Sequence, residues 1–436
     1  MKKFNRIILY GLGNGRDHAN HIELAKCRNI EFCSLITSNN ALMEKYDNVY
    51  HIESVNEAIE FAKKYEADLV IISNRKDLSN GVTEEFRKAG FETFGITKEV
   101  AKLETVKEYA KRFMVRNNIN TPEYYVADDK NDAIKYIQEN WNKTQYGYVF
   151  KVDQFSKNSF ERTAVPDDLE NAIQDIHRLF NSTPNAKLII EEKIVGYELS
   201  LHVIINNGKY AILPLVQDYK KKYPRNEGPM TAGTASVAES KAIPTELLNK
   251  LKNEIIEPTI KGFKNEDIEY NYILYIGVMV SDTGKPYILE YNTRTGNPEW
   301  LSILGLLDRP FIDFIESFYN DVEEIENFWK KDCCSITMYG FSAGYPEVER
   351  KYFNEKIMNL EKIKKDTDII GEHIEKRNND IIPSGGRVFA LRRTGKDFDK
   401  VKKELIEDFY CIKMNGLYFR EDIEKINLRY FIKNTE

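Results

Sequence analysis

The sequence lacks several features that mark particular classes of protein. Its five cysteines form no CxxC pair and their number is odd, which is typical of reduced thiols rather than of a disulfide framework or a zinc site. The longest apolar runs are about half the length that a membrane-spanning helix needs. No segment is of low complexity and 12% of the residues are aromatic, so we do not expect disorder.

An excess of positive charge is also missing. The 63 Lys and Arg residues face 69 Asp and Glu residues, for a formal net charge of −6, which argues against nucleic-acid binding as the main function. The first residues enter a strand-like run without a signal-peptide core. We therefore expect a cytoplasmic protein with no nucleic-acid and no membrane partner. At 436 residues the chain exceeds the roughly 250–300 residues that one core supports, which predicts several domains.

Strand and helix signals alternate at the start of the chain. Buried-type strands are expected at 6–10, 32–37 and 68–72, with helical patterns between them. This alternation predicts a parallel sheet covered by helices, and ligands of such sheets bind at the carboxyl ends of the strands. The glycine-rich turn at 11–16 lies at such an end. A helix N-terminus there would attract phosphate, although a glycine turn alone is weak evidence.

Longer patterns follow. Residues 97–118 predict one long helix that carries Lys107 and Lys111. Two antiparallel hairpins are expected, one across the Asn-Asn-Gly-Lys turn at 206–209 and one across 281–285. From about residue 332 the pattern starts with a strand and ends in short mixed elements.

The segment 290–299 contains the strongest candidate for a metal site. Alternate residues of a strand point to one face, so Glu290, Asn292 and Arg294 would lie together. Oxygen ligands suit Mg²⁺, which takes one or two protein groups and completes its shell with phosphate oxygens. An arginine beside them would neutralise a phosphoryl or carboxylate group. The alternative is a solvated polar strand face.

Two lysines are candidate phosphate ligands. Lys151 follows the apolar strand residues 148–150, and a buried ammonium is costly unless it meets an anion such as an ATP phosphate. Lys107 lies on the long predicted helix. The alternatives are an exposed helix lysine at 107 and, for Lys151, a salt bridge, for instance to Asp153.

Two further segments suggest binding sites. The apolar strand at 189–190 runs into a polar linker, a type of crossing whose backbone reads an adenine edge while a later carboxylate holds ribose. The alternative for its glutamates is a solvated surface. The second segment comprises 217–220 and the small residues 228–236, which predict either a flexible loop that closes on a substrate or a plain connection.

Taken in order, these segments resemble the phosphoribosylamine–glycine ligase (glycinamide ribonucleotide synthetase) family of ATP-grasp enzymes. The resemblance covers nearly the whole chain, and no single motif decides it. The segments that carry it are 13–18, 94–98, 103–107, 151–153, 191–198, 217–220, 228–233, 290–299, 342–346, 384–388 and 419–423.

The resemblance implies a fold of the α/β and α+β classes. It places an N-terminal Rossmann-like domain, similar to that of biotin carboxylase, at 1–98, and an ATP-grasp domain at 99–331 with a lid-like part at about 120–195. A small C-terminal α+β domain would span 332–436. The implied chemistry is phosphorylation of a small-molecule carboxylate by ATP with Mg²⁺ or Mn²⁺, then attack by an amine. The products are an amide, ADP and phosphate, and the enzyme would be a monomer or homodimer.

The resemblance also implies roles for individual residues. Lys107 and Lys151 would hold ATP phosphates, with Lys157 as a further charge. The adenosine would meet Glu191, Glu192, Ile194 and Glu198, and the metal would meet Glu290 and Asn292. Arg294, Lys151 and Asp218 would serve in catalysis. The substrates would contact Gly13, Asn14, Gly15, Arg16, Asp218, Lys220, Thr231 and Gly296.

The sequence departs from the family pattern on the substrate side. The family's glycine-rich phosphate loop has no glycine here, at 153–160, and Arg75 stands where the family has an acid. Met230 replaces an asparagine and Asn297 an aspartate. We therefore expect a ligase with an altered amine or carboxylate. The alternatives are the purine-pathway ligase itself and an ATP-binding protein without catalysis.

Overall fold

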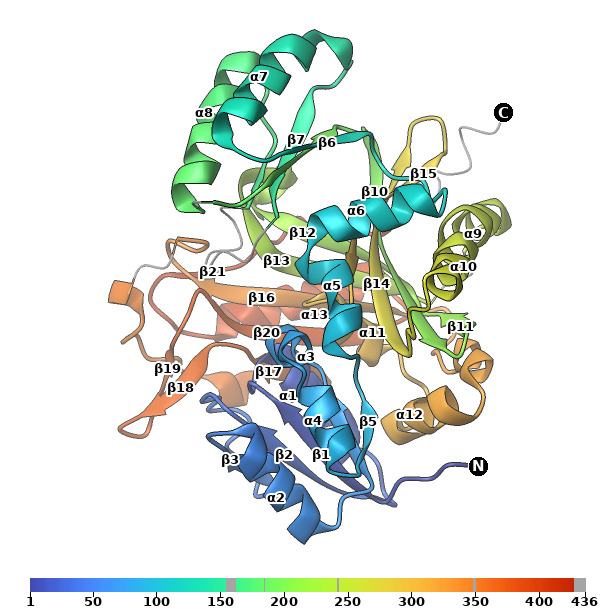
Figure 1. Cartoon of the computed structure of the whole chain (residues 1–436). Helices are drawn as coiled ribbons and strands as arrows, with labels where there is room; N and C mark the ends of the chain where they lie inside the picture. The colour runs from blue at the N-terminus through green and yellow to red at the C-terminus, as the bar shows by residue number, and fades with distance from the viewer. Residues whose placement is uncertain (154–161, 184, 241–242, 348–349, 427–436) are drawn as a thin grey trace.

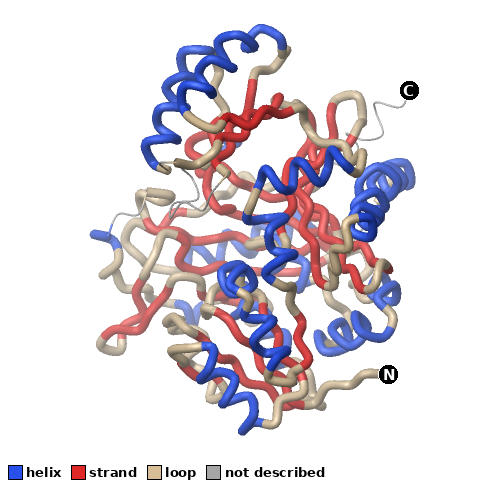
Figure 2. Tube along the Cα trace, in the orientation of Figure 1, coloured by secondary structure: helices blue, strands red, loops and turns tan. Residues whose placement is uncertain are grey.

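The computed structural model describes residues 1–153, 162–183, 185–240, 243–347 and 350–426 (Figure 1). Within these ranges the strands form a five-stranded, a ten-stranded, a four-stranded and a two-stranded sheet. Helices and strands are mixed along the whole chain (Figure 2). None of the described helices combines the length and the apolar character that crossing a bilayer requires.

The five-stranded sheet lies at the N-terminal end of the chain, is wholly parallel and has the order β3-β2-β1-β4-β5. This confirms the predicted parallel sheet, which forms because its central strands are continuous buried apolar runs. The strands are β1 (Arg6–Gly11), β2 (Glu31–Ile36), β3 (Val49–His51), β4 (Leu69–Ile72) and β5 (Glu92–Phe94). Its helices are α1 (Gly15–Ala25), α2 (Val55–Tyr65), α3 (Arg75–Asn80) and α4 (Val82–Lys88).

The prediction of one long helix at 97–118 is wrong. The chain forms two helices, α5 (Lys98–Thr105) and α6 (Lys107–Arg116), separated by Val106 in extended conformation. A second N-terminus is stable here because the Asp153 carboxylate accepts hydrogen bonds from the backbone N–H groups of Lys107 and Glu108. This cap comes from a distant segment, and helical periodicity does not reveal it.

The four-stranded sheet forms a layer of its own, at the top of Figure 1. Its order is β6-β9-β7-β8, and helices α7 and α8 pack together over it. The hydrophobic core between them, with Phe150, Ile176 and Ile190, is separate from the main core. The elements are β6 (Tyr124–Ala127), α7 (Lys130–Asn140), β7 (Tyr148–Val152), β8 (Thr163–Ala164), α8 (Leu169–Ser182) and β9 (Leu188–Glu192).

The ten-stranded sheet forms the centre of the molecule. Its main path is β15-β14-β10-β12-β13-β16-β20-β17, with β11 paired to β10 and β21 to β16. Both predicted hairpins are present, as β10 with β11 and β14 with β15. The strands are β10 (Gly196–Asn206), β11 (Lys209–Ile212), β12 (Leu215–Tyr223), β13 (Glu227–Glu239), β14 (Tyr272–Ser281), β15 (Pro286–Asn292), β16 (Cys334–Ser342), β17 (Thr367–Gly371), β20 (Arg387–Gly395) and β21 (Leu417–Tyr418).

Helices and a small hairpin complete the fold. The two-stranded sheet pairs β18 (Ile374–Arg377) with β19 (Asp380–Pro383). The remaining α-helices are α9 (Thr245–Lys250), α10 (Glu257–Asn265), α11 (Glu299–Gly305), α12 (Phe311–Asn320) and α13 (Phe398–Cys411). Because β13 pairs with β16, one sheet contains strands from both sides of residue 332, and the predicted domain boundaries stay a prediction.

The segment 228–236 is not a loop. It belongs to β13, which pairs with β12 on one side and with β16 on the other. The sequence pattern predicted a loop or a connection here because the segment contains glycines, but in β13 these glycines permit irregular strand pairing. Gly233 has φ +100°, and an added Cβ would lie 2.5 Å from Pro298 Cδ and 3.2 Å from Asp218 Oδ1. The glycine therefore lets β13 approach the loop after β15 closely.

Candidate active site

The predicted metal residues lie at the end of β15. Asn292 donates to Glu290 Oε1 at 3.2 Å and accepts from Arg294 Nη2 at 2.9 Å. The three side chains lie together, as alternate positions predict, although β15 itself ends at Asn292. Lys107 Nζ lies 3.1 Å from Glu290 Oε2. Lys107 is thus not the plain exposed helix lysine of the alternative interpretation.

Surrounding lysines keep Glu290 ionised. Burial alone would raise the pKa of this carboxyl, but the charges of Lys107, Lys220 and Lys151 hold its pKa well below the usual range. An ionised carboxylate beside an amide oxygen is a donor pair that Mg²⁺ accepts. Among the described residues no group of three or more His, Cys, Asp or Glu side chains could hold a metal. A Mg²⁺ ion held by this pair would complete its coordination with phosphate oxygens and water.

Lys151 forms a buried cluster with Lys111 and Glu191. Its Nζ lies 2.9 Å from Glu191 Oε2 and 3.1 Å from the Leu289 carbonyl oxygen, and Lys111 Nζ lies 3.1 Å from the same Glu191 oxygen. The alternative interpretation of Lys151, a salt bridge, is thus realised, but with Glu191 as the partner; Asp153 caps α6 instead.

One carboxylate oxygen of Glu191 is not engaged by the described residues. Glu191 Oε1 is buried and has no hydrogen-bond partner among the residues that the structure describes. A buried acceptor without a donor is costly, so Glu191 Oε1 can accept a hydrogen bond from a bound group. Glu192 and Ile194 continue from this point into the linker before β10. Lys157, the third predicted cation, lies outside the described residues.

Strand β12 brings Asp218 and Lys220 to the same region. Lys220 pairs with Glu198 of β10, the predicted ribose ligand. Asp218 Oδ1 is buried without a hydrogen-bond partner in the described part of the chain. Burial, and next the charge of Glu299, raise the pKa of Asp218 well above its usual value. Asp218 can therefore accept a proton or a hydrogen bond from a bound group.

Two predicted substrate residues are already engaged with neighbouring protein groups. The Thr231 hydroxyl donates to the Lys220 carbonyl at 2.8 Å and accepts from the Gly233 N–H at 3.1 Å. The Gly296 N–H donates to His202 Nε2 at 3.3 Å. His202 stacks on Tyr275, and burial lowers its pKa to about 3, which keeps the ring neutral.

Arg294 shares hydrogen-bond and ion-pair acceptors with two other arginines, Arg16 and Arg75. Its Nε lies 3.2 Å from Glu104 Oε1, and Arg75 Nη1 lies 3.8 Å from the same oxygen. Arg16 Nη1 and Arg294 Nη1 both donate to the Thr295 carbonyl, at 2.8 and 3.0 Å. The sequence assigned no role to Glu104, although it precedes Lys107 by only three positions.

The glycine turn at 13–16 differs from the expected open phosphate cradle. Asn14 caps α1 and accepts from Arg16 N and Asp17 N, while Asp17 accepts from Gly13 N. The Gly15 N–H donates to Glu372 Oε2 at 2.6 Å. A Cβ at position 15 would overlap that carboxylate, so the glycine accommodates a protein side chain here.

The sequence did not indicate Glu372 as a site residue, because it lies far from the glycine turn in sequence, before β18. Arg387 Nη2 donates to its Oε1 at 2.8 Å and Tyr339 donates to its Oε2 at 3.0 Å. Burial would raise the pKa of Glu372, but Arg387 and the hydrogen bonds lower it to about 2. The carboxylate is thus ionised at neutral pH.

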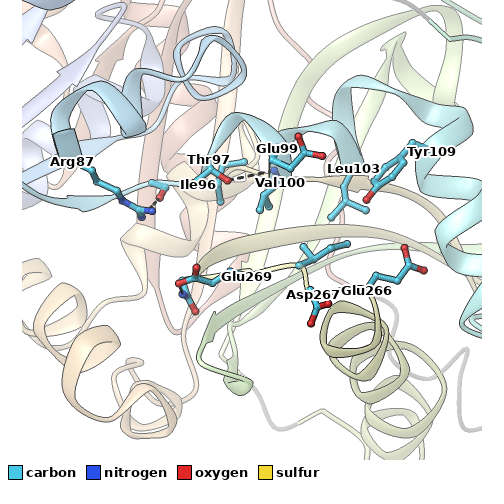
Figure 3. A pocket seen from close by; sticks show the side chains of 13 residues that line it. Arg87, Ile96, Thr97, Glu99, Val100, Leu103, Tyr109, Glu266, Asp267 and Glu269 are labelled. Atoms are coloured by element: carbon cyan, nitrogen blue, oxygen red, sulfur yellow. Dashed lines mark hydrogen bonds between the residues drawn. The ribbon is translucent and has the colours of Figure 1, made fainter.

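Two cavities flank α5. One, of about 10 Å³, touches Lys107, Lys151, Glu191 and Glu290. The other, of about 270 Å³, lies between α5 and the segment after α10 (Figure 3). Its lining includes Glu99, Glu266 and Glu269. Glu266 accepts from Arg116, and Glu269 from Asn271, so these two carboxylates already have protein partners.

Family models match three successive parts of the chain. They describe the N domain of phosphoribosylglycinamide synthetase over residues 5–104, its ATP-grasp (A) domain over 105–300 and its C domain over 335–425. The phosphoribosylamine–glycine ligase of Clostridium acetobutylicum is 30% identical over 432 residues, which cover 96% of this chain and 99% of the relative. The corresponding ligase of Caldanaerobacter subterraneus subsp. tengcongensis is 29% identical over 429 residues, with 96% and 99% covered.

Two solved structures are similar to this chain over nearly its whole length. The crystal structure of phosphoribosylamine–glycine ligase from Thermotoga maritima matches with a TM-score of 0.79 at 26% identity, over 96% of this chain and 100% of that one. Biotin carboxylase from Campylobacter jejuni matches with a TM-score of 0.69 at 15% identity, over 99% and 97%, which establishes the fold alone.

Fold and site together define an ATP-grasp enzyme with the architecture of biotin carboxylase, as the resemblance implied. Members of this class bind ATP and Mg²⁺. More particularly, the chain belongs to the phosphoribosylglycinamide synthetase family. It is accordingly an ATP-grasp carboxylate–amine ligase that forms a C–N bond.

Proposed function

We propose that this ligase activates a carboxylate as an acyl phosphate, with Mg²⁺ and ATP bound between β9, β15 and α6. The observation that carries the proposal is the placement of Glu290 and Asn292 between two cations, with Lys107 at 3.1 Å and Arg294 at 2.9 Å. Two oxygen donors flanked by cations suit a metal-bound triphosphate.

The chain's own residues act by position and charge. Bound Mg·ATP would supply the phosphoryl group. Lys107 and Lys151 would hold the phosphates in place of their present carboxylate partners, and Glu198 would turn from Lys220 to the ribose. Arg294 would neutralise charge on the group in transfer. Positioning and charge neutralisation supply most of the catalysis in phosphoryl transfer.

Asp218 would orient the amine substrate and accept its proton. Its Oδ1 is buried and without a donor in the described structure, and its raised pKa favours taking a proton. An ammonium substrate must lose one proton before its nitrogen can attack a carbonyl carbon. We therefore assign Asp218 Oδ1 as the group that orients the amine and receives its proton.

Two substrate pairs are candidates. Arg75, which follows β4 and stands where the family pattern has an acid, supports an amine or acid that differs from that of the relatives. The names of the relatives support phosphoribosylamine and glycine. Formation of ADP with Mg·ATP should be measured with phosphoribosylamine and glycine, and with pools of amino acids and amino sugars.

The outcomes separate the candidates. Turnover with phosphoribosylamine and glycine at rates typical of enzymes, about 1–10³ s⁻¹, supports the ordinary ligase. Turnover only with other acids or amines supports an altered substrate. No ADP with any pair, although the nucleotide binds, contradicts the proposal of an acyl phosphate.

A further inference from the structure

The C-terminal segment that follows β21 lies against the strand that carries Asp218. Asp218 and Lys220 alternate with Tyr219 along β12, so the two charged side chains point to one face of the strand and Tyr219 to the other. The Tyr219 hydroxyl donates to the Glu424 carbonyl at 3.1 Å and accepts from the Glu424 N–H at 2.8 Å. The face of β12 opposite Asp218 is therefore fastened to the C-terminal segment.

Arg420 holds the same part of β12. Its guanidinium lies 5.1 Å from the centre of the Tyr219 ring, and its Nη1 donates to the Lys221 carbonyl at 2.9 Å. Two bonds from Nε and Nη2, at 2.8 and 2.6 Å, join the guanidinium to the two oxygens of Asp422. Paired bonds of this kind fix geometry as well as charge, and the Arg420 side chain is 1% exposed. Arg420 is therefore a rigid support for β12.

The turn between β12 and β13 depends on Arg420 and Asp422 as well. Arg225 and Asn226, at this turn, have φ +60° and +57°, a left-handed conformation that is uncommon for residues other than glycine. The Arg225 N–H donates to Asp422 Oδ2 at 2.8 Å, and Asn226 Oδ1 accepts from Arg420 Nη1 at 3.2 Å. The C-terminal segment thus stabilises the turn together with the strand.

Strand pairing alone does not fix this stretch of β12. Its register with β13 shifts between Tyr219 and Lys221 and again between Lys221 and Tyr223. The pair with β10 is formed at Val216, before Asp218 is reached. Asp218 Oδ1 has no hydrogen-bond partner in the described part of the chain. The position of this carboxylate oxygen therefore depends on the backbone of β12.

We propose that Arg420 is a positioning residue for the reaction, which together with Asp422 holds β12 so that Asp218 meets the amine substrate. The inference rests on the proposed function, because Asp218 receives the proton of the amine only if an acyl phosphate forms. Arg420 contacts the opposite face of β12 and acts through the strand. A displacement of about 1 Å in a catalytic group can cost about 10²-fold in rate, so the loss of Arg420 should slow the amine step selectively.

Hydroxylamine separates the two steps of the reaction. It is uncharged at neutral pH and reacts with acyl phosphates without a general base, so hydroxamate formation reports the activation step alone. Hydroxamate is measured with Mg·ATP and either glycine or the pooled amino acids as the acid. Amide formation is measured with phosphoribosylamine or the pooled amino sugars added. Arg420→Lys keeps the charge but loses the paired bonds. It should lower kcat/KM for the amine about tenfold or more and leave hydroxamate formation unchanged.

Two further variants locate the effect. Tyr219→Phe keeps the ring and removes the hydroxyl that Glu424 holds, so it should slow the amine step in the same direction. Arg393→Lys is the matched control. Arg393 is 9% exposed and bonded to Glu404 at 2.7 Å, but it lies on β20, which pairs with β16 and β17 rather than with β12. It should lower stability in urea without a selective effect on the amine step.

Two kinetic results would overturn the proposal. One is an equal loss of hydroxamate and amide formation in Arg420→Lys, which indicates a structural role alone. The other is an unchanged kcat/KM for the amine in that variant.

Hydrogen exchange gives a readout that does not need turnover. The backbone amides of residues 218–221 should exchange about tenfold faster in Arg420→Lys than in the unaltered chain, because local opening becomes easier, and Arg393→Lys should show no such increase. Equal exchange in Arg420→Lys and the unaltered chain overturns the proposal. If the unaltered chain forms no hydroxamate with any acid, the proposed acyl phosphate has failed, and the exchange rates still decide whether Arg420 holds β12.

Discussion

The Glu372 carboxylate accepts a hydrogen bond from the backbone N–H of Gly15 at 2.6 Å, across 357 positions of sequence. This bond joins the helix after the first strand to the C-terminal part of the chain. Arg387 holds the same carboxylate and also donates to the Asn297 carbonyl at 2.9 Å. The three parts of the chain that surround the candidate site are therefore tied together at one buried ion pair.

This relationship predicts a pH dependence of stability. The folded pKa of Glu372 is about 2, below the ordinary value of 4.5, so its stabilising effect is complete above pH 4.5 and is lost as the pH falls toward 2. Glu372→Gln should therefore be less stable at pH 7, by an amount on the order of 3 kcal/mol. Urea unfolding between pH 7 and 3 should show the difference shrinking with acid. A difference that is constant with pH would contradict the assignment.

Glu290→Gln should lower turnover by roughly 10²-fold or more, because the proposed metal site would lose its charged ligand. The concentration of Mg²⁺ at half-maximal rate should rise as well. Glu323→Gln, at an exposed carboxylate paired with Lys209, is the matched control and should leave both unchanged. Turnover within a few-fold of the unaltered chain would remove Glu290 from the metal site.

Asp153→Ala should weaken nucleotide binding, because it loosens the position of Lys107. The change removes the cap of α6, which costs about 1 kcal/mol, and frees the first residue of that helix. KM for ATP should rise several-fold. Asp397→Ala removes a cap with two similar bonds from α13 and should lower stability alike without changing KM. Equal KM changes in both variants would contradict a role of Asp153 in positioning Lys107.

Asp218→Asn should abolish turnover and yet stabilise the protein at alkaline pH. Burial and the charges of Glu299 and Glu198 oppose ionisation of Asp218, while Lys220 and Arg387 favour it. Because its folded pKa is raised above the ordinary 3.8, stability falls as the pH rises from that value toward the folded pKa, by about 1.4 kcal/mol for each pH unit between the two. Thermal unfolding should favour the variant at pH 8 and show no difference near pH 4.

Local patterns predicted much of the fold. The hydrophobic runs at 6–10 and 68–72 and the turn at 206–209 carry their own signals, so the parallel sheet and the hairpins were predictable. The alternation at 290–294 likewise brought Glu290, Asn292 and Arg294 together correctly. Each of these features depends on residues that are neighbours in sequence.

Features that depend on distant partners were not predictable. The break at Val106 follows from Asp153, and the closed N-terminus of α1 follows from Glu372. Lys151 pairs with Glu191 rather than with nearby Asp153, because the two lie on adjacent strands, β7 and β9. Periodicity and spacing contain no information on such cross-chain contacts.

The pairing of β13 with β16 has a practical consequence for anyone who shortens this protein. Residues Ala235 to Glu239 take their partners from Met338 to Cys334, so a fragment that stops at residue 331 would leave this buried part of β13 as an unpaired edge strand. Exposed edges of that kind recruit other molecules and precipitate. Expression trials on this enzyme should keep both stretches in one polypeptide, or supply the second as a co-expressed complement.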